Sequence, residues 1–173
     1  MCLSGAKGMD ITMKGLIKQI AILVEDVDKA MQNYWDILGI GPWDVRHFRP
    51  ETCHDFYVNG ELQTEGFDFI CAVCWHEDIE LELIQPIEGP NVYWDTLKRK
   101  GSCLHHFKVV IPDNDELKAY VEELEAKGMK VMQTGWIDND VHYYVDSEDK
   151  LGFILELGNG GAIGEPDYRY PAE

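Results

Sequence analysis

The chain has 173 residues, and its 32 acidic and 15 basic side chains give a formal net charge of −17. This charge repels nucleic acid and anionic membrane surfaces, so we expect neither as a partner, although a local cationic patch could still bind a small anion. No apolar run approaches the roughly 20 residues that cross a bilayer. The first 15 residues lack the apolar core of a signal peptide. We therefore expect a cytoplasmic protein.

The predicted elements begin with a strand rich in Ile and Val over residues 16–26. A helix follows over 27–38, where apolar residues recur at helical spacing, and Gly39 can end it. Asn59 and Gly60 predict a hairpin turn. Two further strands, joined around "HED", are predicted within 66–86. Residues 16–88 thus form a first module.

The same order of elements then returns. A linking segment, 89–101, holds a short helix opened by Pro90 and closed by Gly101. Residues 102–158 contain a strand, a helix and further strands, and both halves end in a strand with the sequence Leu-Glu-Leu. Such self-similarity indicates an internal repeat. The sequence therefore predicts two equivalent modules of strand, helix and strands.

Two segments lie outside the repeat. We interpret residues 1–15 as an N-terminal arm and the Gly- and Pro-rich residues 159–173 as an irregular tail. Tyr168 and Tyr170 could attach this tail to a neighbouring subunit, and we expect a homodimer.

The repeat selects four polar residues, because side chains of a strand alternate between its two faces. Gln19 lies opposite the helix-facing residues of the first strand, and His106 takes the corresponding place in the second half. Glu82 and Glu156 correspond in the closing strands. If the modules pack about a pseudo-twofold axis, these four side chains can converge.

Each of the four residues also has an ordinary structural interpretation when it is taken alone. The histidine, for example, is more often a hydrogen-bonded polar group than a ligand, and His105 is the next candidate. Taken together, one amide, one imidazole and two carboxylates suit a six-coordinate divalent transition metal. We expect Zn, Ni, Co or Mn.

The two halves resemble the paired βαβββ modules of the vicinal oxygen chelate superfamily, which includes glyoxalase I, methylmalonyl-CoA epimerase and extradiol dioxygenases. The resemblance implies an α+β fold with a cupped mixed sheet. It also implies that the metal ligands come from the first and last strand of each module, namely Gln19, Glu82, His106 and Glu156. The segment "VYWDTLKRKGSCLHHFKV" is similar to the epimerases, whereas the ligand set looks like that of some glyoxalases I.

The chemistry that this resemblance implies is removal of a proton next to a carbonyl, through an enolate whose oxygen lies on the metal. We expect a metal-dependent epimerase or isomerase that acts on an acyl-CoA thioester. Glu156 is the first candidate for the base and Glu82 its symmetry-related partner. Asp68 is a possible outer acid or base, although a carboxylate on a strand surface is the more frequent case.

Three alternatives remain. A glyoxalase I-like enzyme would act on a hemithioacetal, and a non-catalytic protein of the superfamily would only bind a small molecule. An Fe(II) dioxygenase requires two His and one carboxylate, which Gln19 disfavours.

Other groups of residues have weaker claims to a role. The basic cluster Lys98, Arg99 and Lys100 could assist a CoA thioester, although basic residues favour helix C-termini in any case. Aromatic residues could line a pocket, but at their spacing they are more often core; they are Tyr34, Trp35, Trp43 and Trp94. Cys71 and Cys74 form a CxxC without a second pair, so we interpret them as reduced cysteines of a strand.

Overall fold

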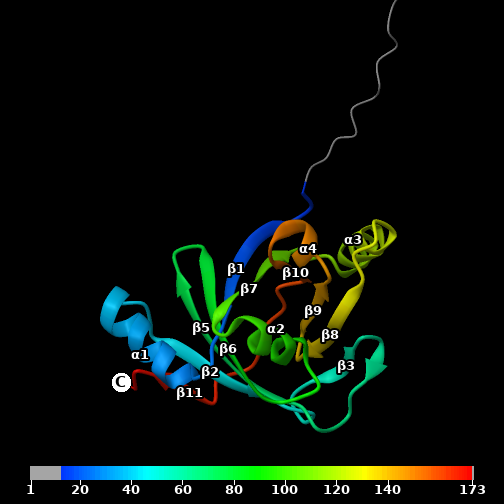
Figure 1. Ribbon diagram of the computed structural model, residues 1–173. Helices are drawn as coiled ribbons and strands as arrows, with labels where there is room; N and C mark the ends of the chain where they lie inside the picture. Colours follow the sequence, from blue (N-terminus) through cyan, green and yellow to red (C-terminus); the bar gives the residue numbers. More distant parts are fainter. Residues whose placement is uncertain (1–12, 173) are drawn as a thin grey trace, which may run out of the picture.

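The structure is a computed structural model that describes residues 13–172. It contains one mixed, strongly curved sheet of eleven strands together with four helices in that part of the chain (Figure 1). The elements are β1 (Leu16–Leu23), α1 (Val27–Leu38), β2 (Trp43–Phe48), β3 (His54–Val58), β4 (Glu61–Leu62), β5 (Asp68–His76), β6 (Ile79–Glu88), α2 (Val92–Lys100), β7 (Cys103–Val110), α3 (Asn114–Ala126), β8 (Val131–Ile137), β9 (Asp140–Val145), α4 (Glu148–Leu151), β10 (Ile154–Gly158) and β11 (Tyr168–Tyr170).

The repeat predicted from the sequence is visible in the sheet topology. The strand order is β11-β2-β5-β6-β1-β7-β10-β9-β8-β3-β4, so the first strands of the two halves, β1 and β7, pair at the centre. Each opening strand also pairs in parallel with the closing strand of its own half, β1 with β6 and β7 with β10. The predicted α+β fold with a cupped mixed sheet is confirmed.

Capping residues in the sequence define the ends of the predicted helices. Asp26 precedes α1, and its side chain accepts a hydrogen bond from the Lys29 amide, which caps the first turn. Gly39 ends this helix in the left-handed region with φ 67°, which glycine adopts without a steric penalty. In α3 the Asp113 carboxylate caps the first turn in the same way.

The two faces of the sheet have separate cores. On the outer face, Ile22 and Leu83 pack with α1, while Val109 and Leu157 pack with α3. On the inner face a third core fills one end of the cup, and Tyr93 of α2 reaches into it. Trp43 is fully buried beneath α1, so its interpretation as a core residue is correct.

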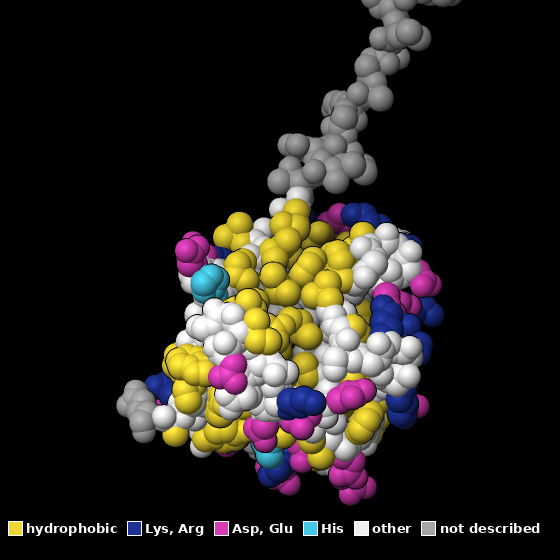
Figure 2. Space-filling view, turned by 60° about the vertical axis from the view of Figure 1, so that its left-hand side comes forward, with side chains coloured by type: hydrophobic (Ala, Val, Ile, Leu, Met, Phe, Trp, Pro, Cys, Tyr) yellow, Lys and Arg dark blue, Asp and Glu magenta, His cyan; other side chains and the backbone are white. Residues whose placement is uncertain are grey.

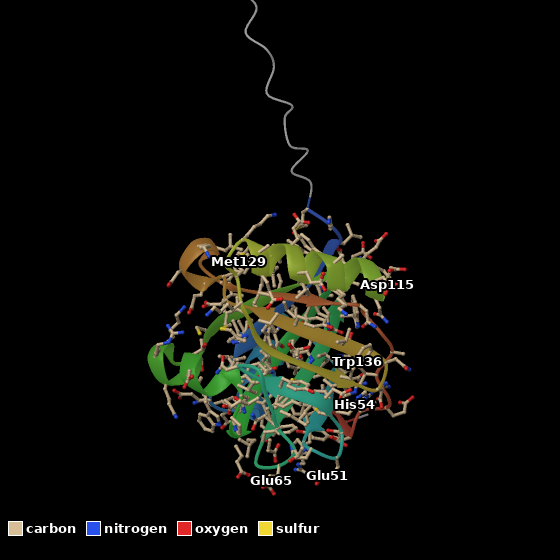
Figure 3. All side chains as sticks on the ribbon, turned by 90° about the vertical axis from the view of Figure 1, so that its right-hand side faces the viewer. Glu51, His54, Glu65, Asp115, Met129 and Trp136 are labelled. Carbon is tan, nitrogen blue, oxygen red and sulfur yellow. The ribbon has the colours of Figure 1, made fainter. Side chains whose placement is uncertain are left out.

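The halves exchange strands at the edges of the sheet, which the repeat does not predict. The β3–β4 hairpin, turned by Asn59 and Gly60, belongs to the first half but pairs with β8 of the second. There the rings of His54 and Trp136 stack with centroids 6.2 Å apart (Figure 3).

The C-terminal tail makes the opposite exchange. Residues 168–170 form β11, which pairs with β2 of the first half, so the expectation of an irregular tail is wrong for these residues. The hydroxyls of Tyr168 and Tyr170 donate to Asp28 and Gln32 of the chain's own α1. These two tyrosines therefore attach the tail to its own first half.

No helix within residues 13–172 combines the length and apolarity needed to span a membrane. The predicted N-terminal arm lies almost entirely outside the described residues.

Candidate metal centre

The four side chains selected by the repeat converge on one atom, Nε2 of His106. The distance from this nitrogen is 2.7 Å to Glu156 Oε2, 3.0 Å to Gln19 Oε1 and 3.5 Å to Glu82 Oε2. His106 is fully buried, and Gln19, Glu82 and Glu156 are each at most 9% exposed as whole residues. The arrangement therefore places one nitrogen and three oxygens in a shielded cluster.

The sheet topology explains the convergence. Glu82, Gln19, His106 and Glu156 lie on β6, β1, β7 and β10, which are four consecutive strands at the centre of the sheet. On each strand the side chain points to the concave face. The neighbours of Glu82, Leu81 and Leu83, pack under α1, and the neighbours of Glu156, Leu155 and Leu157, pack under α3. The alternation of polar and apolar residues in these two closing strands is therefore a consequence of the two-faced sheet.

The orientation of the Gln19 amide is fixed by a second carboxylate. Its Nε2 donates to Glu80 Oε1 at 2.6 Å, which turns Oε1 toward His106. Since a carboxylate only accepts, this contact assigns the two amide atoms. Glu80 thus presents the oxygen of Gln19, the atom that can bind a cation, to the cluster.

His105 departs from the predicted alternation. A β-bulge between β1 and β7 lies at this residue, because Ala21 pairs with His106 and the next residue, Ile22, pairs with Leu104. The bulge turns His105 to the inner face, where its ring packs against Tyr93 and Tyr144. Regular alternation from His106 would place His105 on the helix-facing side, and the bulge shows that this prediction is wrong.

The bulge gives His106 a partner on its far side. The two Nδ1 atoms of His105 and His106 are 2.9 Å apart, so one donates to the other and the His106 ring is held from behind. With Nε2–H of His106 directed at Glu156, Nδ1–H of His105 is the donor. His105 Nε2 then has no partner within the described chain, in agreement with its burial among aromatic rings.

Lys108 is a second feature of the cup that the sequence interpretation did not use. It lies on the same face of β7 as His106, and its ammonium is 3.1 Å from Glu156 Oε1 and 2.9 Å from Asp140 Oδ2. A side chain at Gly158 would collide with it, since a Cβ atom there would be 2.5 Å from Lys108 Cε. Lys108 therefore forms an ion pair with Oε1 of Glu156, while Oε2 of the same carboxylate contacts His106.

These contacts separate the pKa values of the carboxyl groups. Burial raises the pKa of Glu82 to about 8, and the charges of Glu156 and Glu80 add to the effect. Burial acts the same way on Glu156, but Lys108 and His106 outweigh it and hold its pKa well below the ordinary value. Burial also raises the pKa of Asp140. Glu156 is thus a fixed anion, whereas Glu82 takes up a proton readily.

A cavity of about 550 Å³ opens beside the cluster. Gln19, Glu82 and Glu156 line it, together with Lys108 and residues of β2, β5 and β9. One wall contains His142, which is 4% exposed and whose Nε2 has no hydrogen-bond partner in residues 13–172. Burial lowers the pKa of His142 to about 4, so its imidazole is neutral at neutral pH. A neutral imidazole can donate to or accept from a bound ligand.

The other predicted site residues lie away from the cavity. Asp68 is the first residue of β5 and pairs with Arg49, with Nε 3.1 Å from Oδ2. Of the basic cluster, Arg99 and Lys100 pair with Glu148 of α4, and Lys98 lies over the ring of Trp94. The structure therefore brings neither Asp68 nor this cluster to the four converging residues.

The donor set fits a divalent cation in composition and charge. The lining contains the carboxylates of Asp44, Glu80, Glu82, Asp140 and Glu156. Within the described part of the chain, Lys108 is the cation that contacts Asp140 and Glu156. Within residues 13–172, no three His, Cys, Asp or Glu side chains stand at metal-ligand spacing as they lie. In this arrangement Gln19, Glu82 and Glu156 all face the proton on Nε2 of His106. A bound cation would take the place of that proton.

A doubled βαβββ sheet with buried polar side chains on its four central strands defines a class of proteins. The chain belongs to the glyoxalase/bleomycin resistance protein/dioxygenase superfamily, whose sequence model matches residues 18–145. The superfamily includes enzymes. No curated protein sequence matches the chain.

Solved structures share the fold at low sequence identity. A hypothetical protein from Bacillus halodurans is 12% identical with a TM-score of 0.64, covering 88% of this chain and 99% of its own. The methylmalonyl-CoA epimerase from Mycobacterium tuberculosis is 17% identical with a TM-score of 0.59, covering 86% and 92%. A variant of the Streptomyces coelicolor methylmalonyl-CoA epimerase, in complex with 2-nitronate-propionyl-CoA, is 19% identical with a TM-score of 0.56, covering 89% and 100%.

Proposed function

We propose that the protein is a metal-dependent epimerase or isomerase that removes a proton next to a carbonyl, in the manner of methylmalonyl-CoA epimerase. The observation that carries the proposal is the convergence of Gln19, Glu82 and Glu156 on Nε2 of His106 beside a cavity. We propose these four residues as ligands of a divalent cation. When bound, such a cation supplies a Lewis acid that polarises the carbonyl and makes the neighbouring proton acidic.

The two carboxylates have different roles in this proposal. Glu156 uses one oxygen toward His106 and the other toward Lys108, so it cannot move far or accept a proton easily. Glu82 lies farther from His106, with 3.5 Å between Nε2 and its Oε2, and it lines the cavity. We therefore assign the proton transfer to a Glu82 oxygen and the permanent negative charge to Glu156, which reverses the order of preference derived from the sequence.

The volume of the cup suits a small acyl group. A volume of about 550 Å³ lies within the usual range for ligand sites. The similar Streptomyces coelicolor epimerase binds a propionyl-CoA analogue. We propose an acyl-CoA thioester as the substrate class.

Hydrogen exchange at the α-carbon tests this function. The purified protein is analysed for bound metal, reconstituted with Zn, Ni, Co or Mn, and incubated with methylmalonyl-CoA in D₂O. Deuterium at the α-carbon, dependent on the metal, is the expected result. A metal-loaded protein without exchange would overturn the epimerase assignment, and a protein that binds no metal would favour the non-catalytic binding protein of the superfamily.

A glyoxalase I-like lyase is the second candidate, favoured by the donor set of one Gln, one His and two Glu. Such a lyase also removes a proton next to a carbonyl, but reprotonation at the neighbouring carbon isomerises the substrate. A metal-loaded protein that fails with methylmalonyl-CoA but converts the hemithioacetal of methylglyoxal and glutathione would select this alternative.

We also propose that the protein is a homodimer. Figure 2 shows a broad hydrophobic area on the face below the start of the described chain, where β1 begins, and Leu16 and Ile17 of β1 are 63% and 42% exposed. Apolar areas of this kind commonly mark interfaces. Light scattering of the wild-type protein and of a Leu16→Glu, Ile17→Glu variant tests the assignment, since only the variant is expected to be monomeric.

A further inference from the structure

The C-terminal segment forms part of the cavity wall. After β10 the chain crosses to the far side of the cup, where β11 pairs with β2 (Figure 1). Gly161, Ile163 and Arg169 of this segment line the same cavity as the metal centre. Arg169 of β11 pairs directly with Asp44 of β2. The Arg169 side chain therefore lies beside Asp44, which also lines the cavity. The tail is therefore part of the site.

The guanidinium groups of Arg46 and Arg169 both line this wall of the cavity, and each has N–H groups that donate to no protein atom within the described residues. Arg169 Nε donates to Asp44 Oδ1 at 2.7 Å. Arg46 Nε and Nη2 donate to the Gly164 carbonyl oxygen at 3.1 and 2.9 Å. Within residues 13–172, no acceptor takes the remaining hydrogens of the Arg169 Nη atoms or of Arg46 Nη1. Each arginine is thus oriented by one contact and still offers charged N–H groups.

The charge of the cavity shows why these two arginines matter. Five carboxylates line it, and the cations of its lining are Arg46, Lys108 and Arg169. Lys108 is already engaged by Glu156 and Asp140. Among the lining cations within residues 13–172, Arg46 has no carboxylate partner and Arg169 pairs with Asp44 alone, so these two offer an entering anion the least neutralised charge. Arginine is suited to this role, because its planar fork matches a carboxylate or a phosphate.

We propose that Arg46 and Arg169 bind an anionic group of the substrate, a carboxylate or a phosphate, and that the C-terminal segment exists in this site to hold them there. The inference rests on the proposed function for the reactive end of the substrate, whose carbonyl lies at Glu82 and His106. The anionic group lies at the part of the wall that β2 and β11 form. Arg46 depends on the tail as well, since the Gly164 carbonyl orients it.

Binding of simple anions tests the inference without catalysis. Metal-free protein, prepared with a chelator, is titrated calorimetrically with coenzyme A, which carries phosphates, and with methylmalonate, which carries carboxylates. Arg169→Met is expected to weaken the preferred probe at least about tenfold, with a larger loss when Arg46→Met is added, and Arg169→Lys is expected to retain part of the affinity. The probe that responds identifies the anionic group.

Arg99→Met is the matched control, because Arg99 also pairs with a carboxylate but lies outside the cavity. Thermal unfolding of each variant establishes that it is folded, which is expected because β11 pairs through its backbone. Equal binding of both probes to the wild type and the Arg169→Met, Arg46→Met variant would overturn the inference, as would a wild type that binds neither. Failure of deuterium exchange in the wild type would instead overturn the proposed function, since the titrations need no metal and no reaction.

Discussion

His106 is the residue on which the candidate centre depends, because the side chains of Gln19, Glu82 and Glu156 all contact its Nε2. His106→Ala removes the only nitrogen of the set and leaves three oxygens without a common partner. We expect the variant to lose bound metal while remaining folded. Elemental analysis after reconstitution, with circular dichroism for the fold, measures both.

His54→Ala is the control for this variant, because His54 is exposed on β3 and stacks only on Trp136. Metal content in this variant is expected to match the wild type. An unchanged metal content in His106→Ala would show that the metal binds elsewhere or not through this imidazole.

Lys108 compensates two buried carboxylates, so its removal has a large effect on stability. Lys108→Met keeps the apolar stem but leaves Glu156 and Asp140 without their cation. Breaking a buried pair by removing one partner costs about 3–5 kcal/mol, and we expect a loss of that order in the free energy of unfolding of the metal-free protein. Urea denaturation measures it. Lys118→Met, on the exposed side of α3, is expected to change stability by less than about 0.5 kcal/mol, and an equally small change for Lys108→Met would contradict the ion-pair argument.

At the scale of the strands, alternation was sufficient to place four side chains but not the fifth. Glu82 and Glu156 each lie between two leucines, so a period of two assigns their face, and the repeat then selects Gln19 and His106. His105 escapes this rule because a bulge inserts one residue opposite Ala21 and Ile22, and nothing in "CLHHFKVV" distinguishes a bulged strand from a regular one. The sequence therefore favoured His106 as the ligand and kept His105 as the next candidate.

The bulge makes His105 a support for His106, which gives a prediction. His105→Leu keeps a buried side chain of similar size and removes the hydrogen bond to Nδ1 of His106. Loss of a partner that orients a ligand typically lowers metal affinity by about 10–100-fold, and we expect a change in that range. The fold is expected to be retained, since the substitution also removes an imidazole nitrogen that has no partner.

Competition with a chelator of known affinity measures this change. His47→Leu is a suitable comparison, because His47 lies on β2 outside the cavity lining and contacts Arg49. Wild-type affinity in His105→Leu would show that the ring of His106 needs no support from behind.

At the scale of the molecule, the sequence repeat predicted the doubled sheet but not how its edges close. The repeat compares each half with the other, whereas β3–β4 and β11 have no counterpart in the opposite half and pair across the boundary between them. Long-range pairing of this kind leaves no periodic signal. For the same reason the tail's Arg169, and the Lys108 pair with Asp140, could not be assigned to the cup before the strands were placed.

The excess of acid in the cup gives the metal-free protein a pH dependence of stability. In the folded protein the pKa of Glu82 rises from its ordinary 4.5 to about 8. Between these values the folded state holds a proton that the unfolded chain releases, so the stabilisation is complete below about pH 4.5 and is lost progressively as the pH rises to about 8. Glu156 acts in the opposite sense, because its pKa is lowered, but its contribution is lost only as the pH falls below the ordinary value.

We therefore expect the free energy of unfolding of the metal-free protein to fall between pH 7 and pH 8, by up to about 1.4 kcal/mol per pH unit for the Glu82 proton. At lower pH the buried His105 and His142, whose pKa values are lowered from 6.5, act in the opposite sense. Glu82→Gln removes the titrating group and is expected to flatten the profile, whereas Glu125→Gln, on the exposed side of α3, is expected to leave it unchanged. A bound divalent cation should also flatten it, because the cation takes the place of the proton. Urea denaturation at three pH values, with and without the metal, measures each effect, and an identical slope in the wild type and Glu82→Gln would show that Glu82 is not the carboxyl that responds.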